Sequence, residues 1–179
     1  MSNVMLDLET LSTDSNAVIL TIGAVKFDRM NRIPDLHMCN TFYRRIELGS
    51  CEEVGLHTSK DTKGWWDSQS KAAKHEVFIN KDRVGIHQAL CEFVEWFGGS
   101  SYIWAHGDDF DCVVLNSAYK ACDIHPPWKF WNTRDTRTIY DIAGVHINDV
   151  PVELAHHALH DAYRQVVLLQ NSFKILKLK

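Results

Sequence analysis

The chain has 179 residues, 45% of them hydrophobic, and a formal net charge of -4. This length and composition are typical of one globular domain with its own core, so we expect a single domain over residues 1–179. The acidic balance argues against a protein that binds long duplexes through bulk positive charge.

The chain shows no long apolar run and no signal-peptide pattern at its start, which argues against a membrane helix and a secreted protein. The five cysteines are an odd number and include no CxxC pair. Free thiols of this kind are typical of a reducing compartment, so we expect a cytoplasmic protein.

The first part of the chain predicts three strands. Residues 3–9 suit a strand, and residues 17–27 (AVILTIGAVKF) are apolar on both alternating faces, as in the centre of a sheet. Residues 41–46 (TFYRRI) form the third candidate. Because residues 28–40 are rich in turn formers, we expect the last two strands to form a meander.

The rest of the chain predicts alternating helices and strands. Residues 60–80 are polar and partly helical, and residues 86–97 carry apolar side chains at helical spacing that Gly98-Gly99 ends. A strand at 101–106 and a helix at 112–122 follow. Residues 136–143 (TRTIYDIA) form either a fifth strand or the start of a helix, and residues 158–176 form an amphipathic helix. This order predicts an α/β domain.

The first strand carries two carboxylates on one face. Side chains alternate across a strand, so Asp7 and Glu9 project together while Val4, Leu6 and Leu8 face the other way. Neighbouring carboxylates in a partly buried place repel each other and lose solvation, and a divalent cation would remove both costs. The alternative is an exposed edge strand with solvated acids.

A second group of acids follows the strand at 101–106. The segment AHGDDFDCVVL places Asp108, Asp109 and Asp111 in a turn that opens a helix. Acids at this position often cap the helix and complement its dipole, so capping is the alternative to metal binding. Asp111 is the best ligand candidate, because Val114 and Leu115 give its side of the helix an inward face.

The third piece is HHALHDAYRQVVLL at residues 156–169. Asp161 lies in the first turns of an apolar-striped helix. If both residues were helical, His156 would lie about 140° around the axis from Asp161. The two side chains can converge only if His156 precedes the regular helix. The alternative is a polar helix N-terminus with incidental histidines.

Together, a strand DxE, a strand-turn FD and an HxxxxD before the last helix resemble the DEDD exonucleases of the DnaQ-like, RNase-H-like superfamily, in the branch with a catalytic histidine. The resemblance runs from Val4 to the last helix and includes Thr10 and the TIGAVKF strand. The segments GWWDSQS and RDTRT are similar to those of small bacterial and phage members. The resemblance implies an RNase-H-like fold, with helices flanking a mixed five-stranded sheet whose second strand is antiparallel.

The resemblance also implies a metal-dependent 3'-5' exonuclease that acts on single-stranded RNA or DNA and releases nucleoside 5'-monophosphates. Two Mg²⁺ or Mn²⁺ ions would be held by Asp7, Glu9, Asp111 and Asp161, with Asp7 bridging both. His156 would be the general base, a role that suits a side chain with an ordinary pKa of about 6.5. Relatives are often homodimers, so a homodimer is possible.

Members of this family contact the 3' nucleotide just after the first motif, here at Thr10 and Leu11. Of the adjacent tryptophans, Trp66 is our candidate for stacking on a terminal base, a contact worth about 1–3 kcal/mol. Packing in the core is the alternative for both Leu11 and Trp66.

Four residues keep two interpretations each. His157 is the rival general base, since the tyrosine branch uses the position four residues before the last aspartate. The family often has an asparagine shortly before its second-motif aspartate, but this chain has GDDF there, so Asp108 and Asp109 either tune metal binding or cap the helix. Asp135 lies near the site or pairs with Arg134 or Arg137.

Two other functions fit the same fold. A catalytically retired nucleic-acid-binding module would usually lack at least one of the five site residues, and all five are present here. A phosphodiesterase for short oligonucleotides would use the same chemistry and would differ in how its rate depends on substrate length. The sequence does not decide between ribose and deoxyribose, because one or two contacts to the 2' position make that distinction.

Overall fold

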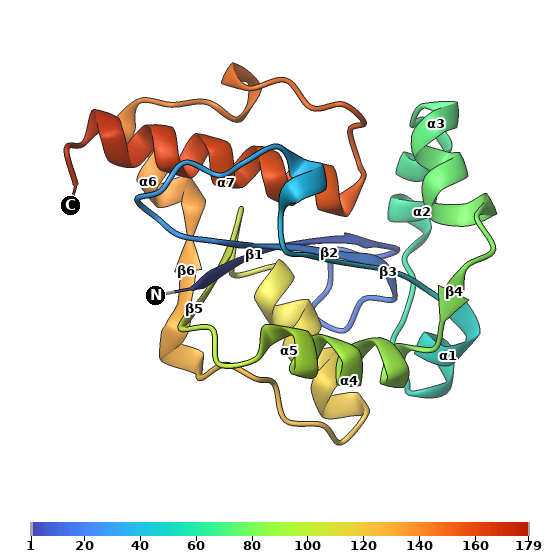
Figure 1. Cartoon of the computed structure of the whole chain (residues 1–179). Helices are drawn as coiled ribbons and strands as arrows, with labels where there is room; N and C mark the ends of the chain where they lie inside the picture. Colours follow the sequence, from blue (N-terminus) through green and yellow to red (C-terminus); the bar gives the residue numbers. More distant parts are fainter. Residues whose placement is uncertain (1, 179) are drawn as a thin grey trace.

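The computed structural model describes residues 2–178 and shows a six-stranded sheet with helices on both faces (Figure 1). The strand order is β4-β3-β2-β1-β5-β6. The strands are β1 (Asn3–Thr10), β2 (Ile19–Phe27), β3 (Thr41–Ile46), β4 (Arg83–Val84), β5 (Tyr102–Ala105) and β6 (Thr133–Asp135). β2 pairs antiparallel with β1 and β3, and the other neighbours pair parallel.

The sheet confirms the α/β class and the antiparallel second strand, but the expected count of five strands is wrong. The additional strand, β4, has two residues, Arg83 and Val84, that pair with the end of β3. Two residues are too few to produce an alternating pattern. The ambiguous segment 136–143 is a helix, and the strand before it, β6, has only three residues.

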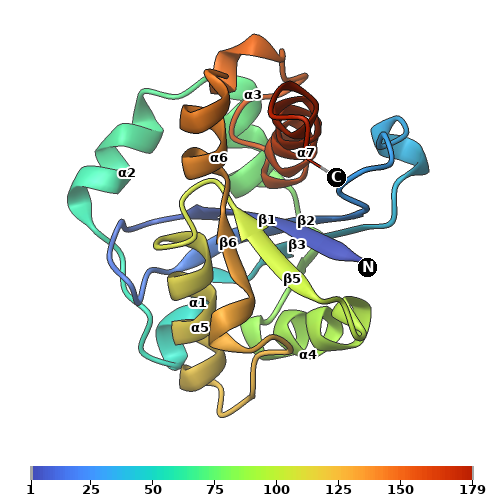
Figure 2. The same ribbon diagram turned by 90° about the vertical axis from the view of Figure 1, so that its left-hand side faces the viewer.

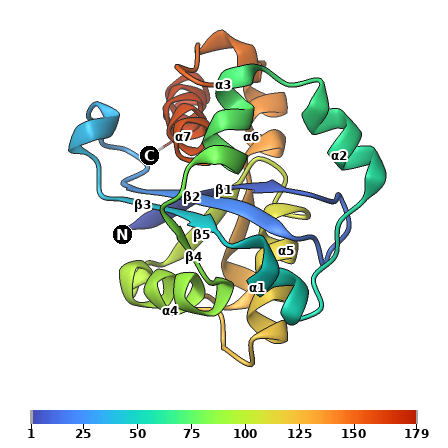
Figure 3. The ribbon, with the colours of Figure 1, turned by 90° about the vertical axis from the view of Figure 1, so that its right-hand side faces the viewer.

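The helices form a layer on each face of the sheet (Figure 2). They are α1 (Leu48–Glu53), α2 (Lys60–Asp67), α3 (Lys71–Lys74), α4 (Ile86–Phe97), α5 (Asp111–Ala121), α6 (Thr136–Ala143) and α7 (Ala158–Ile175), with short turns η1 (Leu36–Met38), η2 (His75–Ile79), η3 (Phe130–Asn132) and η4 (Ile147–Asp149). α1, α4 and α5 cover one face, and α6 and α7 cover the other. α2 projects beyond the end of the sheet, as the view from the opposite side shows (Figure 3).

The alternation of β1 divides its side chains between the two cores. Val4, Leu6 and Leu8 belong to the larger apolar cluster, which includes residues of α4 and α5, whereas Met5 belongs to the cluster that includes α7. Asp7 and Glu9 follow Met5 on the α7 side, as a period of two requires. The two carboxylates therefore lie where the N-terminal end of α7 meets the sheet.

The absence of a side chain at Gly23 allows the start of α7 to approach the sheet this closely. Gly23 pairs with Asp7 across β1 and β2, and a Cβ atom at this position would lie 2.3 Å from the backbone of Ala158 and Leu159. The first turn of α7 therefore rests directly on the β2 backbone. This close approach brings the start of α7 next to Asp7.

All five cysteines are free thiols. Among the described residues, no helix combines the length and the apolar character that crossing a membrane requires.

Candidate active site

Three carboxylates from two elements converge at the carboxyl end of β1. Asp7 and Glu9 come from β1 and Asp161 from the first turn of α7, and one oxygen of each lies within 4.8 Å of the others. Glu9 is 8% exposed and Asp161 7% exposed, while Asp7 is partly exposed. The structure therefore brings these three predicted residues together.

Asp111, the first residue of α5, lies at the edge of the same group. Its Oδ1 accepts a hydrogen bond of 3.0 Å from the backbone N–H of Leu8, which ties the start of α5 to β1. Asp111 is outside the closest trio of acids, yet it lines the same cavity of about 440 Å³ as Asp7, Glu9 and Asp161. The structure thus brings all four predicted acids to one cavity.

Burial and mutual repulsion destabilise the charged forms of these acids. The pKa of Asp7 is raised well above its usual value, first by loss of solvation and then by Asp111, Glu9 and Asp161. Loss of solvation also raises the pKa of Glu9, and it raises that of Asp111 to about 7. The pKa of Asp161 is likewise raised by burial, and nearby Arg164 partly opposes the shift.

His156 lines the cavity and lies just outside the helix, which is the condition that the spacing sets for it to meet Asp161. α7 begins at Ala158, and His156 has a φ of +60°, which is uncommon for a residue other than glycine. Its backbone N–H donates a 2.9 Å hydrogen bond to Oδ2 of Asp161, and its ring meets that of Trp65 edge to face at 4.9 Å. The last acid and the histidine are therefore held together.

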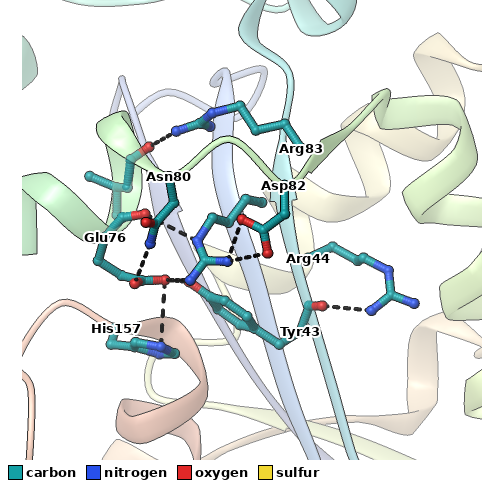
Figure 4. Close-up of polar contacts among 9 residues, drawn as sticks. Tyr43, Arg44, Glu76, Asn80, Asp82, Arg83 and His157 are labelled. Carbon is teal, nitrogen blue, oxygen red and sulfur yellow. Dashed lines mark hydrogen bonds and ion pairs between the residues drawn. The ribbon is translucent and has the colours of Figure 1, made fainter.

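His157 lies in a different environment (Figure 4). Its ring is stacked between Tyr43 at 4.5 Å and His160 at 4.1 Å, and its Nε2 lies 3.6 Å from Glu76 of η2. Burial, and then the neighbouring His160, lower the pKa of His157 to about 4. Because the ring is enclosed and does not line the acidic cavity, we interpret His157 as a packing residue.

The polar group around His157 links η2 to β3. Glu76 is 11% exposed in its side chain, accepts a 2.5 Å hydrogen bond from the Tyr43 hydroxyl and a 2.9 Å bond from Asn80, and pairs with Arg45. These contacts anchor the far end of the segment that carries α2 and α3. The same segment presents its tryptophans to His156.

The environments of Trp65 and Trp66 are the reverse of those that we expected. Trp66 is 2% exposed and donates its indole N–H to the Thr10 carbonyl at 2.8 Å, so it is a core residue and not a platform for a base. The exposed residue is Trp65, at 44%, which lines the acidic cavity and a neighbouring pocket of about 580 Å³. Adjacent residues on a helix point in different directions, and the sequence alone did not show which one faces inward.

The two residues predicted to contact the nucleotide just after the first motif, Thr10 and Leu11, lie in different environments. Thr10 lines the neighbouring pocket, together with Phe110 and Ser59. Leu11 is 4% exposed and belongs to the larger apolar core, which contradicts its predicted contact with a nucleotide.

The remaining acids do not join the site. α5 has no side-chain cap, so neither Asp108 nor Asp109 caps it, and Asp109 is 84% exposed in its side chain. Asp135 caps α6 by accepting from the backbone N–H groups of Arg137 and Thr138. It also accepts from the N–H of Gly107 at 3.0 Å, so it lies near the site without being one of the clustered acids.

Several side chains at the cavity were missed from the sequence, among them Gln165, Arg164, Arg137 and His106. Gln165 donates to Oδ1 of Asp7 at 2.8 Å, and Nη2 of Arg164 lies 2.7 Å from Oδ1 of Asp161. Arg137 of α6 also lines the cavity. A spacing of three and four residues from Asp161 puts Arg164 and Gln165 on its side of the helix, which was the available signal. No comparable spacing marked Arg137.

The donor set fits a divalent cation. Carboxylate oxygens are the ligands that Mg²⁺ and Mn²⁺ prefer, and the four acids share one cavity. Burial and mutual repulsion raise the pKa values of these acids, and a bound cation would offset both effects by stabilising the ionised carboxylates.

Comparison with known proteins identifies similar sequences. The family model of the 3'-5' exoribonuclease Rv2179c-like domain matches residues 2–173. The exodeoxyribonuclease of Enterobacteria phage T4 is 20% identical over an aligned length of 211 residues, and the alignment covers 97% of this chain and 90% of that protein.

Solved structures of nucleases share the fold. The cell-death related nuclease 4 (CRN-4) superposes with a TM-score of 0.60 at 12% identity, covering 97% of this chain, which spans only 64% of that protein. The nuclease domain of 3'hExo, a DEDDh family member bound to rAMP, gives 0.59 at 14% identity and 97% and 92% coverage. S. pombe Pop2p in its Mg²⁺- and Mn²⁺-bound form gives 0.57 at 13% identity and 96% and 82% coverage. The fold is RNase-H-like.

Proposed function

This chain belongs to the 3'-5' exoribonuclease Rv2179c-like domain family and is a 3'-5' exonuclease, and we propose that it removes nucleotides from the 3' ends of single-stranded RNA or DNA. The products would be nucleoside 5'-monophosphates. The observation that carries this proposal is the convergence of four carboxylates and His156, from three distant parts of the chain, on one cavity.

We propose that Asp7, Glu9, Asp111 and Asp161 would hold two Mg²⁺ or Mn²⁺ ions. Bound there, the cations would stabilise the charge that develops on the attacking and leaving oxygens and would acidify a water molecule. Gln165 keeps Asp7 oriented through its 2.8 Å hydrogen bond. The bond from Leu8 to Asp111 holds the second motif against the first.

His156 is the proposed general base. One imidazole nitrogen would take the proton from the attacking water, and the hydrogen bond from its backbone to Asp161 keeps the ring beside the acids. Trp65 packs against the edge of the ring and restricts its motion. His157 has no part in this step because its ring is enclosed by Tyr43 and His160.

The pocket next to the acids is the proposed site for the 3'-terminal nucleoside. Thr10, Trp65 and Phe110 line it, so an exposed aromatic ring is available for a base to stack on. All four bases have such a face, which suits an enzyme with little sequence preference. Both a ribonuclease description and a deoxyribonuclease occur among the similar proteins, so the proposal covers both sugars.

The five free thiols support our prediction of a cytoplasmic enzyme. A single domain and a possible homodimer stay predictions from the sequence.

The proposal is tested with RNA and DNA strands of one sequence, labelled at the 5' end and incubated with Mg²⁺ or Mn²⁺. We expect a ladder of fragments that shortens from the 3' end, release of mononucleotides, and no cleavage in chelator. A retired binding module would retain the strand and release nothing. A phosphodiesterase for short oligonucleotides would cleave di- and trinucleotides much faster than long strands.

A further inference from the structure

Two arginines line the acidic cavity but belong to neither the metal ligands nor the base. Arg137 comes from the first turn of α6, and Arg164 comes from α7, one turn after Asp161. Each carries a planar guanidinium, which matches the geometry of a phosphate group better than any other side chain.

The backbone around Arg137 is fixed where its guanidinium lines the cavity. The guanidinium lies over Gly107, where an added Cβ atom would come within 2.7 Å of the guanidinium carbon. Asp135 joins the two segments, since it accepts from the N–H of Gly107 and from the N–H of Arg137. The turn after β5 and the start of α6 thus lie against each other, and Gly107, with a φ of +104°, leaves room for the Arg137 guanidinium above it.

Arg137 lies at the cavity, and its ion pair within the protein is a weak one. Its ion pair is with Asp109 at 4.0 Å, and both side chains are exposed, at 59% and 84%. Exposed pairs at this distance contribute little and are readily exchanged for another anion. The guanidinium is therefore available to a substrate that enters the cavity.

Arg164 is more enclosed, with 18% of its side chain exposed. Its Nη2 donates to Asp161 at 2.7 Å, and its Nε is buried without a hydrogen-bond partner among the described residues. Buried donors are normally satisfied, so this Nε has one bond still to make. An anion in the cavity is a candidate acceptor, because Arg164 lines it.

Building on the proposed exonuclease function, we propose that Arg137 and Arg164 form a subsite for the scissile phosphate, binding its non-bridging oxygens from the α6 and α7 sides of the cavity. The phosphate that they hold leaves as the 5'-phosphate of the released mononucleotide. Together with the proposed cations, this subsite would favour a polyanion at the four carboxylates of a chain whose net charge is -4. It also gives a role to the RDTRT segment, in which Asp135 positions Arg137.

Calorimetric titration tests the subsite without turnover. Adenosine 5'-monophosphate and adenosine are titrated into Mn²⁺-saturated wild type, Arg137→Gln, Arg164→Gln and the control Arg134→Gln. The control removes the same charge three residues away, where Arg134 lies over the Tyr102 ring and bonds the Trp131 carbonyl. Mn²⁺ affinity is measured first for each protein, so that a change at Asp161 is recognised.

We expect each of the two cavity variants to bind the monophosphate about tenfold more weakly, as the loss of one charge-assisted hydrogen bond predicts. Adenosine, which lacks the phosphate, should bind all four proteins equally. The log-log slope of kcat/KM on a single strand against NaCl should become shallower by about 0.7 for each arginine removed. Arg137→Lys, which keeps the charge, should retain most of that slope.

Unchanged monophosphate affinity in both folded cavity variants would overturn the subsite, as would an equal loss in Arg134→Gln or an equal loss for adenosine. The two proposals fail separately. A wild type that shortens no strand contradicts the proposed function, whereas a wild type that shortens strands while Arg137→Gln and Arg164→Gln bind the monophosphate normally contradicts only the subsite.

Discussion

The backbone N–H of His156 donates a 2.9 Å hydrogen bond to Oδ2 of Asp161, and this bond explains the five-residue spacing between them. A helix would place the two residues on different sides, so His156 leaves the helix at a φ of +60°. Asp161 accepts this hydrogen bond from the turn that precedes α7. Its position on α7 places its carboxylate next to those of Asp7 and Glu9. The proposed base and the proposed metal ligand are therefore positioned by the same contact.

The adjacent histidines should respond differently to replacement. His156→Ala should lower kcat by about 10²- to 10⁴-fold, the usual contribution of a general base, with Mn²⁺ binding retained. His157→Ala should keep measurable turnover but lower the free energy of unfolding, because it removes a ring stacked between Tyr43 and His160. Single-turnover rates and urea unfolding distinguish the two. A larger loss of rate in His157→Ala would restore His157 as the base.

The four clustered acids should make the metal-free protein less stable as pH rises, and their combined effect should exceed the opposite contribution of His157, whose pKa is lowered to about 4. The folded pKa of Asp111 is about 7, above an ordinary value of about 3.9 for the unfolded chain. Between these values the folded state binds more protons than the unfolded state, so the free energy of unfolding falls as pH rises. Asp7, Glu9 and Asp161 are shifted in the same direction.

Melting curves in chelator from pH 5 to pH 7 measure this effect, because these values lie within the window between the two pKa values, about 4 to 7. Mn²⁺ should raise the Tm more at the upper end, since the ionised acids bind it better. Asp7→Asn should melt higher than wild type in chelator and should lose the activity. A Tm in chelator that rises with pH over this range would contradict the electrostatic account.

The two tryptophans should separate binding from stability. Trp65→Ala should raise KM by a factor that corresponds to about 1–3 kcal/mol of stacking, with a small change in Tm. Trp66→Ala should cost about 3–5 kcal/mol of stability, because it empties a buried site and removes the bond to Thr10. Equal KM values for Trp65→Ala and wild type would exclude Trp65 as a stacking platform.

Gly23 should be intolerant of any side chain. In Gly23→Ala the added Cβ atom would lie 2.3 Å from the backbone of Ala158 and Leu159, so the start of α7 must move. We expect a loss of about 1–3 kcal/mol of stability and a loss of rate, since α7 carries Asp161. Gly64→Ala is the matched control. Nothing lies within 4 Å of its added Cβ atom, and alanine suits the interior of α2.

Much of the fold could be predicted because the decisive signals are local. The apolar spacing of residues 86–97 and Gly98, whose φ is +42°, defined a helix with the predicted ends. The alternation of β1 placed Asp7 and Glu9 on one face, opposite Leu6 and Leu8. The two residues of β4 carry no such signal, because their pairing with β3 depends on tertiary structure.

The same distinction between local and tertiary signals applies to the site. The resemblance to the DEDD exonucleases implied the four acids and His156. Which neighbour of an adjacent pair faces inward depends on how α2 docks, and so Trp66 was chosen over Trp65. Arg137 reaches the cavity only because Gly107 and Asp135 bring two distant segments together. Contacts of this kind are set by packing between elements, which the sequence pattern of either element does not reveal.

The most direct test of the central claim is anomalous scattering from crystals of the protein grown with Mn²⁺. The account predicts two Mn²⁺ ions in the cavity, bound by oxygens of Asp7, Glu9, Asp111 and Asp161, with Asp7 contacting both. Mn²⁺ absent from this cavity at saturating concentration, or bound there by other residues, would contradict it.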